Sequence, residues 1–212
     1  MRSSVLKLGA FIFILALIIF GAKTIVTTPF FSDTETSENN KITVAERFCE
    51  IKKVWAAGVE SVSQGTLKNG GAITDPNRTN PNKALGPNDW VPGTGTNFFS
   101  LGKGGTTTLS FSSPVLDGEG DDLSFHEATN GRATYPEEKV SVEVSKDETT
   151  WYSIGEATSE PGGDGIVLLD FSSIGLSSVK FVRLTETTNF DPHLGNADGY
   201  DLDAVDAVYG CE

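Results

Sequence analysis

KVSVEVSKDETTWYSIG, at residues 139–155, is the segment that most clearly indicates a fold class. Val140, Val142 and Val144 occupy alternate positions in it, with polar residues between them. Side chains of an extended strand point alternately to its two faces, so the three valines share one face. A polar turn then separates this run from a second apolar run that begins at Trp151. The pattern predicts two short strands joined by a turn.

Segments of this kind recur along the rest of the chain, separated by turns rich in glycine, asparagine and aspartate. We expect strands near residues 59–63, 98–101, 106–112, 123–127, 139–145, 151–155, 166–171, 179–185 and 203–209. Eight or nine strands in a chain of this length predict an all-β protein with a jelly-roll β-sandwich. The long interval at 65–97 has few strand-forming residues, which favours an ordered, functional loop.

A hydrophobic segment near the N-terminus predicts export. The apolar run Leu8–Ala22 follows two basic residues, which is typical of a signal peptide, and we expect a hydrophobic signal helix there. Either the segment is removed, or it is retained as an anchor that Ile25 and Val26 extend. The expected regions are a signal peptide or signal anchor at 1–31, a polar linker at 32–57 and a β-sandwich at 58–212.

Acidic residues dominate the chain after this segment. There are 16 basic and 29 acidic residues in all, and the first 31 residues contain three basic residues and no acidic ones. A strongly negative surface repels the phosphates of nucleic acids and anionic lipid headgroups, and it attracts cations. We therefore expect no nucleic-acid partner, and membrane contact only through an uncleaved N-terminal segment. Charge alone is compatible with either solubility or specific cation binding.

The two cysteines, Cys49 and Cys211, bracket the expected sandwich. Outside the cytoplasm such a pair should be oxidised. If the first and last strands are neighbours, a disulfide between them would stabilise the fold by roughly 3 to 5 kcal/mol in the loop-entropy model. Two cysteines without C-x-x-C spacing do not indicate a zinc site.

The residues after the hydrophobic segment, TTPFFSDTETSENNKITVA at 27–45, resemble the segment that follows the signal in camelysin and TasA-type surface and biofilm-matrix proteins. The resemblance covers about 20 residues and implies their export route, hence a secreted or cell-surface location. In those families a short aromatic segment near the cut site seeds assembly. Phe30 and Phe31 therefore either mediate self-association or form the C-terminal region of the signal.

A second resemblance covers roughly residues 58–210 and rests on six segments in a fixed order. They are ALGPNDW (84–90), FFSLGKGGTTTLSF (98–111), VLDGEGDDLSFHE (115–127), KVSVEVSKDETTWYSIG (139–155), VKFVRLTE (179–186) and DGYDLDAVDAVYG (198–210). The ordered set is similar to bacterial cell-surface domains related to the discoidin and galactose-binding-like jelly rolls. The resemblance implies a binding module without a named ligand.

Two acidic clusters adjoin the expected strands and suggest calcium. Calcium takes about six to eight oxygen ligands, and glycines between the acids let backbone carbonyls turn inward as well. The candidate ligands are Asp117, Asp121, Asp122 and Glu127 in the first cluster, and Asp198, Asp201 and Asp203 in the second. Asp201 and Asp203, two positions apart on an extended chain, can converge. Alternatively, these are ordinary turn residues, since neither cluster has EF-hand spacing.

Aromatic residues in or beside loops are candidates for sugar binding, because an aromatic face stacks on a sugar ring while acids or amides bind its hydroxyls. The candidate ligand-binding residues are Trp90, Asp89, Tyr135 and Tyr200. Trp90 is the strongest of these, and packing at a loop hinge is its alternative role.

The sequence favours a non-enzymatic role. It contains no G-x-S-x-G, H-E-x-x-H or phosphate-loop motif, and His126 and His193 lack metal-ligand spacing. We expect a calcium-stabilised, secreted or cell-surface module that binds a surface glycan or protein. The alternatives are a self-assembling surface or biofilm-matrix subunit, and a glycoside-active enzyme that would use acids such as Glu127 and Asp201.

Overall fold

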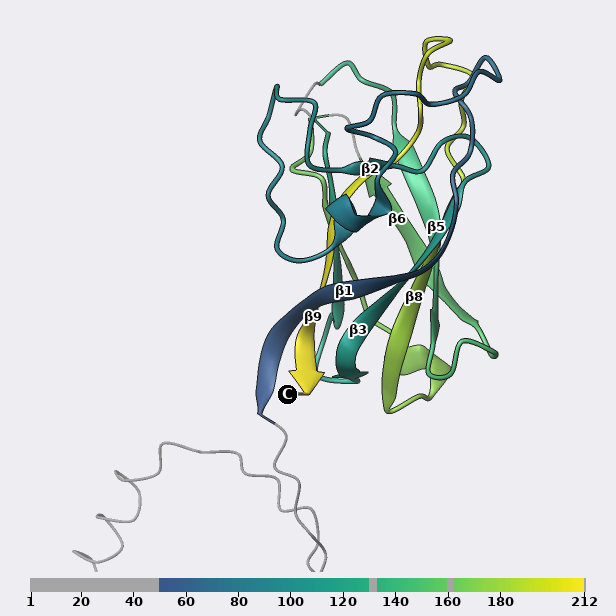
Figure 1. Ribbon diagram of the computed structural model, residues 1–212. Coiled ribbons are helices and arrows are strands. Elements are labelled where there is room, and N and C mark those ends of the chain that lie inside the picture. The colour runs from purple at the N-terminus through teal and green to yellow at the C-terminus, as the bar shows by residue number, and fades with distance from the viewer. Residues whose placement is uncertain (1–49, 130–132, 160–161, 212) are drawn as a thin grey trace, which may run out of the picture. The chain divides into compact units, whose positions relative to one another are not determined.

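The computed structural model describes residues 50–129, 133–159 and 162–211, which form nine strands and two single-turn 3₁₀ helices (Figure 1). The strands are β1 (Ile51–Ser63), β2 (Phe99–Ser100), β3 (Thr106–Leu116), β4 (Leu123–Glu127), β5 (Glu138–Ser145), β6 (Tyr152–Ser159), β7 (Ile166–Leu169), β8 (Ser178–Glu186) and β9 (Asp201–Cys211). The helices are η1 (Pro81–Ala84) and η2 (Ser172–Ile174). The prediction of an all-β sandwich with eight or nine strands is confirmed.

The strands form one wrapped sheet in the order β6-β5-β8-β3-β1-β9-β4-β7, and β2 pairs with the start of β9. All of these pairings are antiparallel. The two outermost strands, β6 and β7, also contact each other, so the sheet nearly closes on itself. The result is a flattened sandwich with its core between the two layers.

β1 belongs to both layers. Its first part pairs with β9, as Val54 does with Ala207, and its second part pairs with β3, as Val59 does with Leu109. Register shifts interrupt the pairing, which is how a bulged strand bends from one layer into the other. The expected start near Val59 was wrong, because β1 begins at Ile51. Residues 51–57 of the expected linker are strand, since Val54 and Ala56 are alternate core residues there.

The core consists of apolar side chains at alternate positions of the strands. Val140, Val142 and Val144 of β5 are fully buried, as their alternation predicts. Phe125 of β4 and Leu184 of β8 face the same core. Burial of each such side chain stabilises the fold by about 1.5 to 3 kcal/mol before the loss of chain entropy is counted.

The loops that join β1 to β2, β4 to β5 and β8 to β9 gather at one end of the sandwich, drawn at the top of Figure 1. We call this the loop end. The opposite end holds the start of β1 and the end of β9, where Ile51 pairs with Cys211. The first and last strands are therefore neighbours, as the expected disulfide requires.

Several predictions concern residues outside the described part of the chain. They are the signal segment, the linker as far as residue 49, the aromatic pair Phe30 and Phe31, and the partner cysteine Cys49. The disulfide therefore stays a prediction. Within the described residues, no helix has the length and hydrophobicity needed to cross a membrane.

Candidate functional site

Three core-facing rows of side chains end in a glutamate at the loop end. In β4 the row that contains Leu123 and Phe125 ends at Glu127, and in β5 the valine row begins at Glu138. In β8 the row that contains Leu184 ends at Glu186. Each glutamate keeps the inward direction of its row, so all three carboxyl groups are buried between the layers.

Glu127 and Glu138 are the least compensated of these acids. No donor meets either carboxylate oxygen of Glu127 at ideal hydrogen-bond geometry among the described residues, but Ser159 and the backbone of Asp201 lie close enough to lower the pKa of Glu127. Burial raises the pKa of Glu127 to about 7. Burial also raises the pKa of Glu138 well above its usual value, and the negative charges of Asp201 and Glu127 raise it further. A charge on Glu127 thus disfavours a charge on Glu138 in a desolvated site.

Glu186, by contrast, has a structural role. Its oxygens accept hydrogen bonds from the backbone N–H groups of Thr188, at 2.8 Å, and Tyr200, at 2.7 Å. The carboxylate therefore anchors the loop between β8 and β9. Gly199 makes this approach possible, because a Cβ at that position would lie 2.2 Å from Oε2 of Glu186. Its φ of +73° is also one that favours glycine.

Arg78, from the long β1–β2 loop, pairs with the acids at the start of β9. Its Nη1 donates to Oδ2 of Asp198 at 2.6 Å and lies 3.6 Å from Oδ2 of Asp201. Asp201 also accepts a hydrogen bond from the hydroxyl of Ser100. The guanidinium lies over the ring of Phe98, with 5.0 Å between Cζ and the ring centroid. Arg78 thus joins the loop to β9 through contacts with two neighbouring acids.

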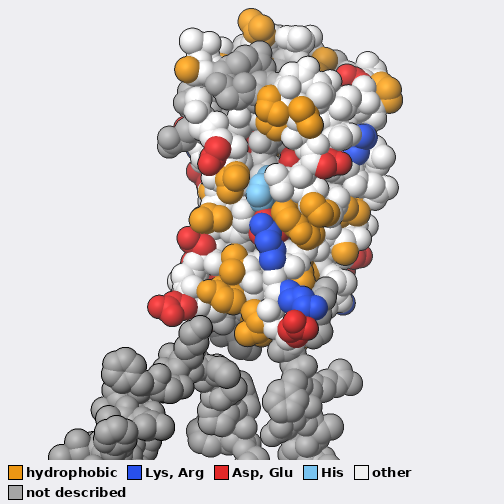
Figure 2. All heavy atoms as spheres, turned by 90° about the vertical axis from the view of Figure 1, so that its left-hand side faces the viewer, with side chains coloured by type: hydrophobic (Ala, Val, Ile, Leu, Met, Phe, Trp, Pro, Cys, Tyr) orange, Lys and Arg blue, Asp and Glu red, His pale blue; other side chains and the backbone are white. Residues whose placement is uncertain are grey.

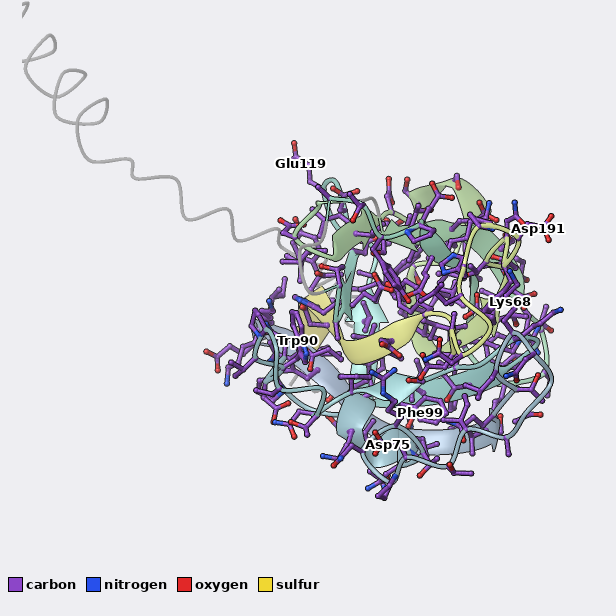
Figure 3. All side chains as sticks on the ribbon, turned by 90° about the horizontal axis from the view of Figure 1, so that it is seen from above. Lys68, Asp75, Trp90, Phe99, Glu119 and Asp191 are labelled. Atoms are coloured by element: carbon purple, nitrogen blue, oxygen red, sulfur yellow. The ribbon has the colours of Figure 1, made fainter. Side chains whose placement is uncertain are left out.

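A cleft of about 620 Å³ opens beside this pair at the loop end. It is lined by residues of all three loops, among them Asp75 and Arg78, Thr134 and Tyr135, and Asn196 and Asp198. Lys68 ties the β1–β2 loop to the β8–β9 loop, because its Nζ donates to the carbonyls of Asp191 and His193. Figure 3, a view from above, shows Lys68 beside Asp191, with Trp90 on the other side of the molecule.

Tyr135, an expected ligand-binding residue, lines this cleft and is half-buried. Its ring packs edge-on against the imidazole of His193, with 5.6 Å between the ring centroids. Its hydroxyl donates to Oε1 of Glu138 at 3.0 Å. A residue of the cleft wall is therefore hydrogen-bonded directly to the buried acids.

Tyr200 was wrongly expected to bind ligand, because its side chain is fully buried in the core. Tyr200 directly precedes β9, and its side chain points into the core instead of toward solvent. The phenol oxygen has no hydrogen-bond partner among the described residues. Burial raises the pKa of Tyr200, and so do the nearby charges of Glu127, Glu186 and Glu138. The hydroxyl therefore faces the buried acids and not solvent.

Trp90 and Asp89 lie apart from the cleft and share a different partner. Their backbone N–H groups both donate to Oδ1 of Asp203, at 3.2 and 3.3 Å. The carboxylate of Asp203 therefore holds the end of the long loop against β9. Asp201 and Asp203 have different partners, because Asp201 contacts Ser100 and Arg78 while Asp203 accepts the two backbone N–H groups.

The expected first calcium cluster is divided between the two ends of β4. Asp122 precedes the strand and Glu127 ends it. Asp117, Asp122 and the unexpected Asp170 form a group whose carboxylate oxygens lie within 4.8 Å of one another, and Asp121 is not a member. Both oxygens of Asp122 accept backbone hydrogen bonds, from Gly118 and Phe171. This turn is already stabilised by its own backbone donors.

The outward face of the β1, β9, β4 and β7 layer carries both apolar and charged side chains. Figure 2 shows hydrophobic side chains spread over it around a histidine and basic groups. The register aligns Trp55, Asp206, Ser124 and Leu168 across the four strands. Ile166 and Leu168 of β7 are 45% and 51% exposed.

Ser124, His126 and Asp206 meet on this face but do not have the geometry of a catalytic triad. Ser124 Oγ and Asp206 Oδ1 both contact Nε2 of His126, at 3.1 and 2.6 Å. A triad needs the serine at one ring nitrogen and the acid at the other. Lys53 pairs with the remaining oxygen of Asp206 at 3.0 Å. The arrangement is a polar network in which His126 and Asp206 are buried, and the ring of Trp55 lies 5.7 Å from the imidazole.

Comparisons with known proteins identify no family. No protein-family model matches the chain, and neither does any curated protein. The C-terminal domain of a chitobiase from Bacteroides fragilis is similar in structure, at 16% identity and a TM-score of 0.46, over 74% of this chain and 95% of that domain. The CBM32 domain of AlyQ, in complex with 4,5-unsaturated mannuronic acid, gives 11% identity and a TM-score of 0.42, over 72% and 96%.

A third similar structure is CBM32-3 from a family 31 glycoside hydrolase of Clostridium perfringens. It gives 12% identity and a TM-score of 0.35, over 51% of this chain and 68% of that domain. All three TM-scores are below 0.5. The fold of this chain is established by its own strand order.

Proposed function

We propose that this protein is a secreted or cell-surface binding module that holds a glycan, or another surface component, in the cleft at the loop end. The observation that carries the proposal is the position of Tyr135 and the Arg78–Asp198 pair in the walls of one cleft. Small-molecule sites typically occupy about 300 to 1,000 Å³, and the volume of this cleft falls in that range.

The cleft offers both kinds of contact that a sugar ring requires. Arg78 and Asp198 place a charged donor and a charged acceptor side by side, so they can bind adjacent hydroxyl groups. Asn196 is exposed and adds an amide donor and acceptor. The ring of Tyr135 offers an apolar surface for the C–H face of a sugar. This combination favours a neutral or partly charged polyhydroxylated ligand.

The same geometry argues against the acid pair considered for glycoside hydrolysis. Glu127 is 4% exposed, and Asp201 is occupied by Ser100 and Arg78. Hydrolysis needs two carboxyl groups that flank the scissile bond of a bound sugar. Neither acid is among the residues that line the cleft, so the pair does not flank a sugar bound there, and the proposed module is non-catalytic.

Self-association is a second candidate function, favoured by the apolar outward face of β7 and β9. Ile166, Leu168 and Val208 are each more than 40% exposed. Such a face is a possible contact between copies in a surface layer or fibre. Sedimentation of the wild type and of Leu168→Lys over a range of concentrations tests it. An unchanged monomer at every concentration of the wild type would reject this candidate.

The extracellular location rests on the N-terminal hydrophobic segment and its resemblance to exported proteins. The chain after this segment is strongly acidic, which favours a partner without phosphate groups or anionic lipid headgroups. Fractionation of cells that express the chain with a C-terminal tag tests the location. Recovery of the tag in the cytoplasm alone would contradict it.

A glycan array tests the binding function. The labelled chain, shown to be folded by circular dichroism, should bind a related subset of glycans above background. A folded chain that binds no glycan would reject the glycan as ligand. The same preparation is incubated with a polysaccharide panel, and release of reducing ends would reject the non-catalytic assignment.

A further inference from the structure

We propose that a groove on the outward face of β1, β3 and β8 is a second ligand site, which binds a neutral sugar unit of a glycan. The groove has a volume of about 510 Å³. Its lining includes Gly58 and Glu60 of β1, Ser110 and Ser112 of β3, Phe181 of β8 and Glu148 of the β5–β6 turn. None of the described residues that line it also lines the cleft at the loop end.

Interruptions of strand pairing produce the hollow. β3 pairs with β8 as far as Ser110 and Phe181, and the pairing resumes only at Val115 and Val179. β1 shifts its register against β3 at the same level, beside Gly58. Figure 1 shows the three strands side by side. Bulges of this kind leave part of the ladder unpaired, and they are frequent beside binding sites. The groove is therefore built into the middle of the sheet.

The floor of the groove combines an aromatic ring with hydroxyl groups. Ser110 lies opposite both Gly58 and Phe181 in the register, and its neighbours in β3 point into the core, so Ser110 points outward. Gly58 leaves room for this side chain, because a Cβ there would lie 2.6 Å from Oγ of Ser110. The hydroxyls of Ser110 and Ser112 have no hydrogen-bond partner among the described residues. Both can therefore bind a ligand beside Phe181.

Charged groups of the groove also lack partners. Glu60, Glu148 and Lys180 form no ion pair in the part of the chain that the structure describes. Nζ of Lys180 lies 5.9 Å from the centroid of the Phe181 ring, so a donor stands beside the aromatic surface. Carboxylates accept hydrogen bonds from hydroxyl groups, and an ammonium group donates to them. The groove thus offers both hydrogen-bond roles next to an apolar surface.

The backbone of Glu148 has a conformation that is unfavourable for a residue with a Cβ, since its φ is +64°. Neighbouring contacts enforce it. The N–H of Glu148 donates to Oγ of Ser145 at 2.9 Å, and its carbonyl accepts a 3.1 Å hydrogen bond from the indole of Trp151. Unfavourable backbone geometry that the surroundings impose is frequent at ligand-contacting positions. The turn therefore fixes Glu148 at the groove at a cost in stability.

These groups favour a neutral, polyhydroxylated ligand. The two acids of the groove outnumber its one lysine, and the chain as a whole is acidic, so an anionic sugar would be repelled. A neutral sugar presents hydroxyls to the serines and acids and a C–H face to Phe181. The volume suits a small ligand, since such sites occupy about 300 to 1,000 Å³. The inference rests on the proposed function for the class of ligand, and a second site would let the module hold one glycan at two points.

Nuclear magnetic resonance tests the groove without knowledge of the natural glycan. The isotope-labelled chain is titrated with glucose, galactose, mannose and N-acetylglucosamine, and with glucuronate as the anionic comparison. We expect at least one neutral sugar to shift the backbone amide signals of Gly58, Ser110 and Phe181 in a saturable manner. Glucuronate should bind more weakly. Shifts at Asn196 and Ala197 report the cleft separately in the same spectra.

Variants at exposed positions keep the test independent of folding. Ala57→Leu fills the groove, and Glu60→Gln removes one carboxylate. We expect each to weaken binding in the groove at least tenfold and to leave the shifts of the cleft unchanged. Tyr135→Ala should have the opposite effect. Glu156→Gln is the matched control, because Glu156 is an exposed acid of β6 that does not line the groove.

Three results would overturn the proposal. The first is a folded wild type in which no neutral sugar shifts the amides of the groove, and the cleft shifts then decide the proposed function by themselves. The second is binding in the groove that Ala57→Leu and Glu60→Gln both preserve. The third is tighter binding of glucuronate than of every neutral sugar. Shifts in the groove without shifts in the cleft would support this site and reject the cleft as the site of the proposed function.

Discussion

The hydroxyl of Tyr135 donates a 3.0 Å hydrogen bond to Oε1 of Glu138, so a side chain in the cleft wall is anchored to an acid in the core. Glu138 occupies the inward position of β5 that precedes Val140, Val142 and Val144. The apolar alternation that builds the sandwich thus also places an acid beneath the loops. The cleft and the core are connected through this pair.

Removal of this bond should cost stability. We expect Tyr135→Phe to lower the free energy of unfolding by about 1 to 2 kcal/mol, because a buried carboxylate loses its donor. Tyr209→Phe is the control, since Tyr209 donates to the carbonyl of Glu119 in an exposed setting. Urea unfolding of both variants measures the difference. Equal losses in the two variants would contradict the special role of Tyr135.

Loss of the Arg78 guanidinium should be more damaging. Arg78→Gln leaves Asp198 and Asp201 without their cation, and we expect a loss of roughly 2 to 4 kcal/mol in urea unfolding. Arg183→Gln is the matched control, because its pair with Glu143 is about one-third exposed on each side. Such pairs contribute only about 0 to 1 kcal/mol. If both variants lose the same amount, Arg78 does not compensate buried charge.

Gly199 and Gly175 have nearly the same backbone conformation, so alanine substitutions at the two positions distinguish the cost of a steric clash from the cost of the conformation itself. Gly199 and Gly175 have φ of +73° and +72°, but a Cβ would strike Glu186 only at Gly199. We expect Gly175→Ala to cost about 1 kcal/mol, the usual penalty for this conformation, and Gly199→Ala at least twice as much. Thermal unfolding measures both. A smaller loss for Gly199→Ala would show that Glu186 can move aside freely.

The expected disulfide can be tested directly. The register places Ile51 opposite Cys211. Cys49 lies two residues before Ile51 in the chain, so it is close in sequence to the partner of Cys211. Mass spectrometry of the unreduced protein should give a mass two hydrogens below that of the reduced form. Reduction should lower the free energy of unfolding by about 3 to 5 kcal/mol. Two free thiols in protein isolated from the cell surface would reject the bridge.

Asp147 provides a pH dependence with a definite sign. Hydrogen bonds from the backbone of Thr150 and Thr149 lower the pKa of Asp147 to about 2. An acid with a lowered folded-state pKa stabilises the fold above its unfolded-state pKa of about 3.9, and this contribution is lost as pH falls through 2. The wild type should therefore be more stable than Asp147→Asn at about pH 5, and the two should converge only as the pH falls below about 2. A difference that does not change with pH would contradict this assignment.

The strands were predictable because their periodicity is local. Alternation in β5 and the apolar run in β4 specify both the strand and its buried face within a few residues. β1 was harder, because its first residues mix lysines with Val54 and Ala56, and a bulge interrupts the alternation. Its start was therefore assigned to the linker.

The site was predictable only in part. Glu127, Asp198 and Asp201 were recognised as acids near strand ends, and Tyr135 as a loop aromatic. Glu138 was missed, although its position in the same alternation as the three valines was a usable signal. Arg78 lies 120 residues from Asp198 in the chain, so only the fold reveals their contact. The burial of Tyr200 likewise depends on how the β8–β9 loop turns inward.

We expect the glycan to bind in the cleft beside Tyr135 and not on the surface near Trp90. Calorimetric titration of the strongest array glycan into the wild type, Tyr135→Ala and Trp90→Ala tests it, once melting curves show that each variant is folded. We expect Trp90→Ala to bind as the wild type does and Tyr135→Ala to bind at least tenfold more weakly. Binding that is lost in Trp90→Ala and kept in Tyr135→Ala would place the glycan near Trp90 and reject the cleft as its site.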